Sequence, residues 1–87
     1  MFEMNLEAKN VEVRGHEKKT SQQGKEYLIV RVEDETGRPS ELYDPNVENS
    51  SYYERGTIGD FSLNVRIGKY SKVTINNFWP QTDQDPD

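Results

Sequence analysis

The sequence predicts an all-β fold in which five short antiparallel strands close into a small barrel. Apolar and polar residues alternate along several short segments, as they do in half-buried strands. No segment repeats apolar residues at helical spacing over three turns. The chain has 87 residues, which fits one small domain. We expect this domain to span residues 1–80 and residues 81–87 to form a disordered acidic C-terminal tail.

The first expected strand changes face within its length. Apolar residues occupy even positions as far as Ala8 and odd positions at Val11 and Val13. Such a change of parity predicts a bulge or a sharp bend, which lets one strand serve two sides of a small barrel. Gly15 is expected at the far end of this strand, and the polar segment 18–25 is expected to separate it from the next.

Four further strands follow from the same alternation, over residues 27–32, 41–43, 61–67 and 73–79. Residues 44–60 show no stable period and predict a long irregular loop, whereas residues 68–71 predict a hairpin turn. Chains with five such strands usually form a closed or nearly closed barrel, because closure removes exposed strand edges. An OB-like barrel is therefore the expected architecture.

The apolar composition is low for a domain that folds alone. Leu, Ile, Val and Phe together account for 18 of the 87 residues, close to the roughly 20% below which chains tend to stay disordered. A dimer or a compact barrel would relieve this shortage. The chain has no cysteine, which excludes disulfides and thiolate zinc sites.

Signals of catalysis are weak throughout the chain. His16 lies among charged residues without a nucleophile pattern, and the acidic run 33–35 is best interpreted as a solvated turn. The segment around Gly24 lacks the spacing of a phosphate-binding loop. We therefore expect no enzyme activity, no metal and no cofactor. No apolar run approaches the roughly 18 residues of a membrane span, so we expect a cytoplasmic protein without membrane contact.

Charge is distributed unevenly along a chain whose formal net charge is −5. Residues 9–25 hold five basic and two acidic residues, residues 66–72 hold three basic residues and no acidic one, and residues 33–48 are strongly acidic. Each basic segment adjoins or contains an aromatic residue, Tyr27 or Tyr70. Basic side chains beside exposed rings are typical of single-stranded nucleic acid binding. Solvated hairpins with charged tips are the alternative.

The other aromatic residues have different expected places. Phe61 and Phe78 continue the apolar faces of strands and are expected in the core. Tyr43, Tyr52 and Tyr53 flank the irregular segment and are further candidates for stacking on bases.

Two segments resemble motifs of the gene V proteins of filamentous phages. Residues 21–27, S-Q-Q-G-K-E-Y, are similar to the wing motif S-R-Q-G-K-P-Y of that family, and residues 67–75, I-G-K-Y-S-K-V-T-I, to its hairpin V-G-Q-F-G-S-L-M-I. The resemblance covers these stretches and the strand order, and it leaves residues 33–60 unaligned. It implies a single-stranded DNA-binding homodimer with a five-stranded OB-type barrel.

The resemblance also implies roles for individual residues. Tyr27 matches the wing tyrosine at the DNA face, Ile29 an apolar position beside it, and Lys25 a wing lysine. Tyr70 matches a hairpin phenylalanine that reaches the DNA site of the partner subunit.

The sequence departs from the family where two arginines are expected. Gln22 and Asn77 stand at these positions, and neighbouring lysines would have to supply the missing charge. The predicted nucleic-acid-binding residues are Lys18, Lys19, Lys25, Tyr27, Ile29, Arg66, Lys69, Tyr70 and Lys72.

The expected function is binding of single-stranded DNA without sequence preference, by a protein of a phage or mobile element that coats or protects DNA during replication. The acidic tail is similar to those of replication single-strand-binding proteins, which implies recruitment of a replication protein; a disordered solubilising terminus is the alternative. The alternative is a protein-binding, OB-like accessory factor of replication or conjugation without DNA affinity. The acidic segment 33–48 and the missing arginines favour this alternative.

Overall fold

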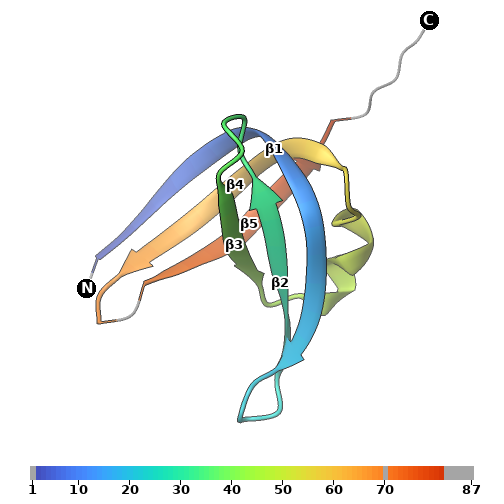
Figure 1. Ribbon diagram of the computed structural model, residues 1–87. Coiled ribbons are helices and arrows are strands. Elements are labelled where there is room, and N and C mark those ends of the chain that lie inside the picture. Colours follow the sequence, from blue (N-terminus) through green and yellow to red (C-terminus); the bar gives the residue numbers. More distant parts are fainter. Residues whose placement is uncertain (1, 70, 82–87) are drawn as a thin grey trace, which may run out of the picture.

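The computed structural model describes residues 2–69 and 71–81. It is all-β apart from one short 3-10 helix, as predicted. The elements in chain order are β1 (Phe2–Thr20), β2 (Glu26–Glu33), β3 (Pro39–Asp44), the 3-10 helix η1 (Val47–Tyr52), β4 (Ile58–Ile67) and β5 (Lys72–Pro80) (Figure 1).

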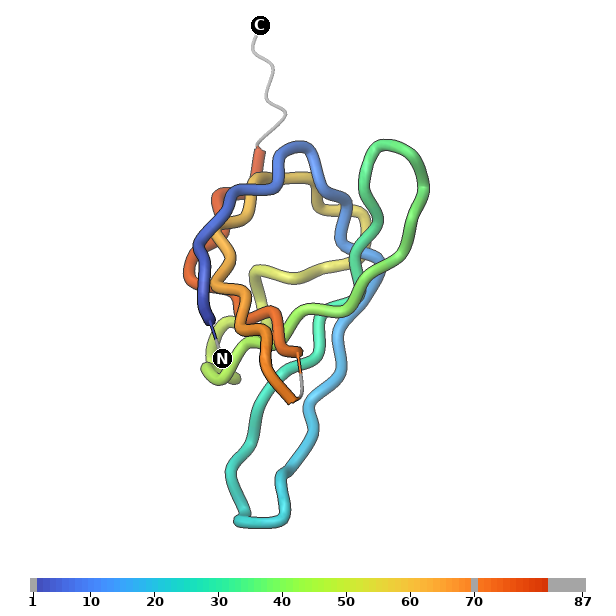
Figure 2. Tube along the Cα trace, turned by 90° about the vertical axis from the view of Figure 1, so that its left-hand side faces the viewer, coloured from blue at the N-terminus to red at the C-terminus, as the bar shows by residue number. Residues whose placement is uncertain are grey.

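The five strands form one sheet that closes into a ring in the order β1-β2-β3-β5-β4, with β4 pairing back onto β1 (Figure 2). Four of the neighbouring pairs are antiparallel, but β3 and β5 run parallel and meet at Tyr43 and Thr74. The prediction of a fully antiparallel sheet is therefore wrong. A ring with an odd number of strands cannot alternate direction all the way round, so at least one pair must be parallel.

β1 serves two sides of the ring, as its change of parity predicted. Its first part pairs with β4 and its second part with β2. A bulge lies between Ala8 and Val11, where Asn10 has a φ of 56°. Asparagine tolerates this left-handed conformation better than most residues do. The bulge turns the strand so that both Ala8 and Val11 face the core.

The expected end of the first strand at Gly15 is wrong. Gly15 lies at a second irregularity of β1, which continues to Thr20 and pairs there with Glu26. Lys18 and its neighbours, expected in a loop, are therefore strand residues. The far end of this hairpin is exposed on both faces, so burial imposes no alternation on its sequence. The turn is held by Ser21, whose N–H donates to the Lys25 carbonyl at 2.8 Å.

The core lies inside the ring and is built from alternate residues of every strand. Phe61 is fully buried, as expected, and its ring stacks on the partly buried Phe78 with 4.3 Å between centroids. Gly59 is required beside this pair, because a Cβ there would lie 2.5 Å from the Trp79 carbonyl oxygen. The other buried apolar residues are Val11, Val13, Leu28, Val30, Val32, Leu42, Tyr53, Leu63 and Ile75.

Residues 44–60 contain η1, where the sequence predicted only an irregular loop. A buried carboxylate holds this helix to the barrel. Asp44 accepts hydrogen bonds from the Tyr53 hydroxyl at 2.6 Å, the Asn49 amide at 3.0 Å and the Asn46 backbone N–H at 2.9 Å. The segment is thus ordered by polar contacts to one residue of β3.

In the described part of the chain, no helix has the length and apolar character that a membrane span requires. Residues 82–87 lie outside the described residues, as does the expected disorder of the acidic tail.

Candidate functional site

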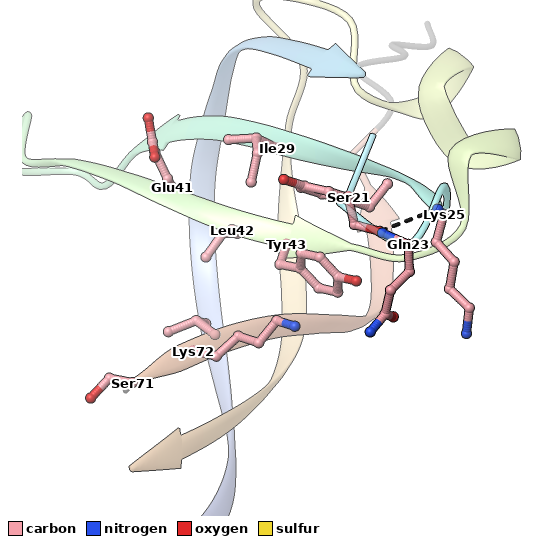
Figure 3. Close-up of a pocket in the computed structure, with 11 residues that line it drawn as sticks. Ser21, Gln23, Lys25, Ile29, Glu41, Leu42, Tyr43, Ser71 and Lys72 are labelled. Carbon is pink, nitrogen blue, oxygen red and sulfur yellow. Dashed lines mark hydrogen bonds between the residues drawn. The ribbon is translucent and has the colours of Figure 1, made fainter. Parts of the chain in front are cut away.

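An open groove of about 570 Å³ crosses the outer face of β2 and β3 and reaches the start of β5 (Figure 3). One end lies at the turn between β1 and β2, and the other at the residues that enter β5. The groove is lined by Ser21, Gln23, Lys25, Tyr27, Ile29, Glu41, Leu42, Tyr43, Ser71, Lys72 and Val73.

Strand alternation decides which side chains of β2 face the groove. Leu28 and Val30 are fully buried in the core, so Tyr27 and Ile29 must point to the outer face. Residues directly opposite each other on paired strands share a face. Tyr43 on β3, which pairs with Ile29, therefore joins the same outer surface.

Two tyrosine rings and one ammonium group form a continuous cluster in the groove. The rings of Tyr27 and Tyr43 lie 5.1 Å apart between centroids, with their planes 37° apart. The Lys72 Nζ lies 3.8 Å from the centroid of the Tyr43 ring, a cation–π distance. Figure 3 shows the Lys72 side chain running along its strand toward this ring. The three side chains come from β2, β3 and β5.

The lysines in and beside the groove form no ion pair among the described residues, whereas most other basic residues have a carboxylate partner. Among the described residues, no carboxylate lies within 4.0 Å of the ammonium groups of Lys25, Lys72 or Lys19, which pairs with Tyr27 across β1 and β2. In the same described part of the chain, Arg38 and Arg55 also have no carboxylate within 4.0 Å, but they do not line the groove. The basic residues with a carboxylate partner are Lys9, Arg14, Lys18, Arg31 and Arg66. The positive charge of the groove is therefore available to an anionic ligand.

Acidic charge is present at one end of this surface. Glu41 lines the groove, but its carboxylate lies 3.9 Å from Arg31, which also contacts Glu17 at 2.9 Å. The guanidinium thus offsets part of the negative charge at this end.

The structure brings together four of the predicted binding residues, Lys25, Tyr27, Ile29 and Lys72, with Lys19 at the edge of the groove. Tyr70 lies outside the described residues. Lys69 lies in the turn between β4 and β5 and does not line the groove.

Two other residues that were predicted to bind nucleic acid form ion pairs outside the groove. Lys18 pairs with Leu28 and therefore belongs to the opposite face of the hairpin from Tyr27, and its Nζ lies 3.5 Å from Glu26. Arg66 contacts Glu3 at 3.0 Å, and its guanidinium lowers the pKa of the Glu3 carboxyl by a hydrogen bond and by its charge. Neither side chain lines the groove.

Tyr43 has the central ring of the groove. The sequence named it only as one of three additional tyrosines that could stack on bases, with Tyr52 and Tyr53. The alternation around Leu42 was the available signal, because a buried Leu42 requires an outward Tyr43. Tyr52 is exposed on η1 but does not line the groove. Tyr53 is buried in the core, so its interpretation as a stacking residue is wrong.

The residues weighed for catalysis have structural contacts. His16 donates from Nδ1 to the Tyr53 carbonyl at 2.8 Å, which ties β1 to the end of η1. Asp34 accepts hydrogen bonds from Thr36 and from the Arg38 backbone N–H, and the Thr36 hydroxyl contributes most to lowering the pKa of its carboxyl. In the described ranges, no group of His, Asp and Glu side chains is arranged to hold a metal ion.

Neither a scan against protein-family models nor searches of curated proteins and solved structures return a match for this chain. The functional argument therefore depends on the geometry and charge of the groove.

Proposed function

We propose that this protein binds single-stranded DNA in the groove across β2, β3 and β5, without strong sequence preference. The observation that carries the proposal is the contact between Tyr27, Tyr43 and Lys72. Two further lysines, Lys19 and Lys25, flank it and have no carboxylate partner among the residues that the structure describes. Aromatic faces and unpaired cations in one groove are the two features that single-strand binding requires.

Stacking supplies the part of the affinity that does not depend on sequence. Every base has a π-face, and stacking on an aromatic side chain contributes roughly 1–3 kcal/mol per base. The rings of Tyr27 and Tyr43 line the open groove rather than the core, with their planes tilted by 37°. A duplex hides its base faces, so this mode of contact favours single strands.

The lysines supply the electrostatic part. Lys25 lies in the turn at one end of the groove, and the Lys72 ammonium lies over the Tyr43 ring, so a phosphate chain that follows the rings would meet both cations. Lys19 adds a third charge beside Tyr27. The overall charge of −5 opposes DNA binding at long range, so we expect weaker affinity than a basic protein with the same groove would have.

The position of the groove fits an OB-type barrel, which we propose as the finer description of the fold. In OB-folds, the face of strands 2 and 3 and the loops between strands 1 and 2 and strands 4 and 5 bind oligonucleotides. The groove lies on β2 and β3, between the turn at residues 21–25 and the start of β5. This placement supports a gene V-like protein of a phage or mobile element that coats single-stranded DNA during replication.

Salt dependence tests this proposal. If Lys19, Lys25 and Lys72 each neutralise one phosphate, the log–log slope of affinity against salt is about −2, at about −0.7 per phosphate on a single strand. Affinity for a labelled oligo-dT should then fall about 20-fold between roughly 50 and 200 mM salt. Fluorescence anisotropy at several salt concentrations measures the slope.

The hairpin offers a matched pair of variants for the same titration. Lys19→Ala should reduce the steepness of the slope by about 0.7, because Lys19 shares the face of Tyr27. Lys18→Ala should leave the slope unchanged, because Lys18 pairs with Leu28 on the other face. Equal slopes for both variants would contradict the placement of the phosphates, and absence of binding would favour a protein-binding factor instead.

A further inference from the structure

The first part of β1 forms a free edge of the sheet (Figure 1). Residues 2–8 pair with β4 on one side, whereas β2 begins to pair with β1 only at Glu12. Among the described residues, no strand therefore lies on the other side of residues 2–8, and this segment contains no proline. A strand edge of this kind presents backbone N–H and C=O groups with which a further strand can pair. We call this side of residues 2–8 the free edge.

A row of uncovered apolar side chains runs along the free edge. Phe2, Met4 and Leu6 alternate with polar residues and share a face with Ala8, which packs against the core. Phe2 is 60% exposed, Met4 44% and Leu6 41%. A sheet edge that combines open backbone groups with an exposed apolar row is suited to the addition of a strand from another chain.

A pocket of about 180 Å³ lies at the end of this row, between the bulge of β1 and the hairpin formed by β2 and β3. Leu63 lines the pocket and is opposite Leu6 in register, so the pocket adjoins the apolar row. An apolar cavity of roughly 150 Å³ holds one benzene ring, so this pocket has room for one large apolar side chain. The pocket is lined by Ala8, Val11, Val32, Asp34, Ser40, Leu42, Phe61 and Leu63.

Acidic side chains surround the free edge and the pocket. Glu3 and Glu7 lie on the other face of the free edge, and each has a basic partner there. Asp34 lines the pocket, and Glu35 accepts a hydrogen bond from the Asn10 side chain at the bulge, at 3.0 Å. In the part of the chain that the structure describes, no basic group lies within 4.0 Å of the carboxylates of Asp34 and Glu35. A strand with basic side chains on its outer face would complement this charge.

The C-terminal residues of this sequence do not fit the free edge chemically, although the described chain ends near it. Gln81 donates a hydrogen bond from its side chain to Asn10 at 2.7 Å. Residues 82–87 contain three aspartates and no Leu, Ile, Val, Met or aromatic residue. They therefore supply no large apolar side chain for the row or the pocket, and their charge has the same sign as that of the carboxylates around the pocket.

We propose that the free edge binds an extended segment of a partner protein in which apolar side chains alternate with basic ones. The segment would add to the sheet as a strand beside β1. Its apolar side chains would cover Phe2, Met4 and Leu6, with one of them in the pocket, and its basic side chains would lie beside Glu3 and Glu7. A second copy of this chain would instead bring like charges to the edge. None of residues 2–8 lines the groove, so this proposal does not depend on nucleic-acid binding.

Titration of the full chain with a labelled octapeptide of alternating leucine and lysine tests the proposal. Fluorescence anisotropy at about 50 mM salt, where screening is weak, should show saturable binding. A peptide of the same composition, with the leucines and the lysines in two separate blocks, should bind about tenfold more weakly, because it cannot place apolar groups on one face and basic groups on the other. Absence of saturable binding, or equal binding of the two peptides, would overturn the proposal.

Backbone methylation of the alternating peptide distinguishes strand addition from general apolar or electrostatic attraction. In a strand that pairs on one side only, alternate residues direct their N–H groups to the neighbouring strand. Methylation of the N–H groups of the leucines should therefore have a very different effect from methylation of those of the lysines. One of these two peptides should lose binding and the other should keep it, whereas equal effects would exclude pairing along a strand edge.

A pair of protein variants places the peptide on the free edge. Leu6→Glu should weaken binding of the alternating peptide by about tenfold or more, because it puts a charge among apolar side chains. Ile58→Glu is the matched control and should leave the affinity unchanged, since Ile58 is 43% exposed, similar to Leu6, but faces the other side of β4. If circular dichroism shows that Leu6→Glu does not fold, Phe2→Glu replaces it. Unchanged affinity in the folded variant would place the peptide elsewhere and overturn the proposal.

Sedimentation velocity of the protein without peptide tests whether a second copy occupies the free edge instead. A wild-type protein that dimerises, becomes monomeric with Leu6→Glu and binds no alternating peptide would contradict the proposal. A complex with one peptide per chain, lost with Leu6→Glu and kept with Ile58→Glu, would support it.

Discussion

Replacing Tyr43 with alanine is expected to weaken binding of a short oligo-dT by about 10- to 100-fold while the barrel stays folded. Tyr43 contacts both Tyr27 and Lys72, so its removal breaks the continuous surface of the groove. The loss of one stacking platform costs roughly 1–3 kcal/mol, and about 1.4 kcal/mol corresponds to a tenfold change in affinity. Anisotropy titrations at low salt measure the change.

Tyr52→Ala is the control for this variant. Tyr52 is the more exposed of the two tyrosines but lies on η1, outside the groove. Removal of the Tyr52 side chain should change the affinity less than twofold, because this side chain does not line the groove. Equal losses of affinity for the two variants would show that exposed tyrosines contribute non-specifically. An unchanged affinity for Tyr43→Ala would exclude the groove as the DNA-binding site.

Replacing Asp44 with alanine is expected to reduce the free energy of unfolding by about 2–4 kcal/mol, a large fraction of the stability of a small domain. Asp44 is 2% exposed and accepts hydrogen bonds from three donors. The variant leaves the buried Tyr53 hydroxyl without its acceptor. In the wild-type protein, burial and secondly the hydrogen bond to Asp44 raise the pKa of this hydroxyl, which is therefore a protonated, buried donor.

Urea denaturation followed by circular dichroism measures this effect. Glu48→Ala is the control, because Glu48 is an exposed acidic residue of η1 and should change the midpoint little. Tyr53→Phe should recover part of the stability in the Asp44→Ala background, since it removes the unsatisfied donor. An unchanged midpoint for Asp44→Ala would show that η1 is held by its apolar contacts alone.

Strands were predictable from the sequence wherever one face is buried. The alternation around Phe61 and around Leu28 reflects burial on one side, and both segments are strands. The end of β1 and η1 were not predictable in the same way. Both faces of the β1–β2 hairpin end are in water. η1 depends on hydrogen bonds to Asp44, two of which come from the side chains of Asn49 and Tyr53, and such contacts leave no periodic pattern in the sequence.

The candidate site was predictable in composition but not in geometry. Proximity in sequence suggested that Lys18 and Lys19 act together, but strand pairing places them on opposite faces. The sequence also left Tyr43 beside an irregular segment, because its position depends on the parallel contact with Thr74 that closes the ring. Closure of the ring, rather than local pattern, brings Lys72 to Tyr43.

The alternation of Met4 and Leu6 with polar residues predicted a buried face, yet the single chain leaves these side chains exposed. Alternation indicates that a face is suited to being covered and does not identify what covers it.

Titration of a labelled oligo-dT with the wild-type protein at about 50 mM salt, beside a duplex of the same length, tests the central claim most directly. The groove predicts saturable binding of the single strand and much weaker binding of the duplex, whose base faces cannot reach Tyr27 and Tyr43. No binding of either, or equal binding of both, would contradict single-strand recognition by the two rings.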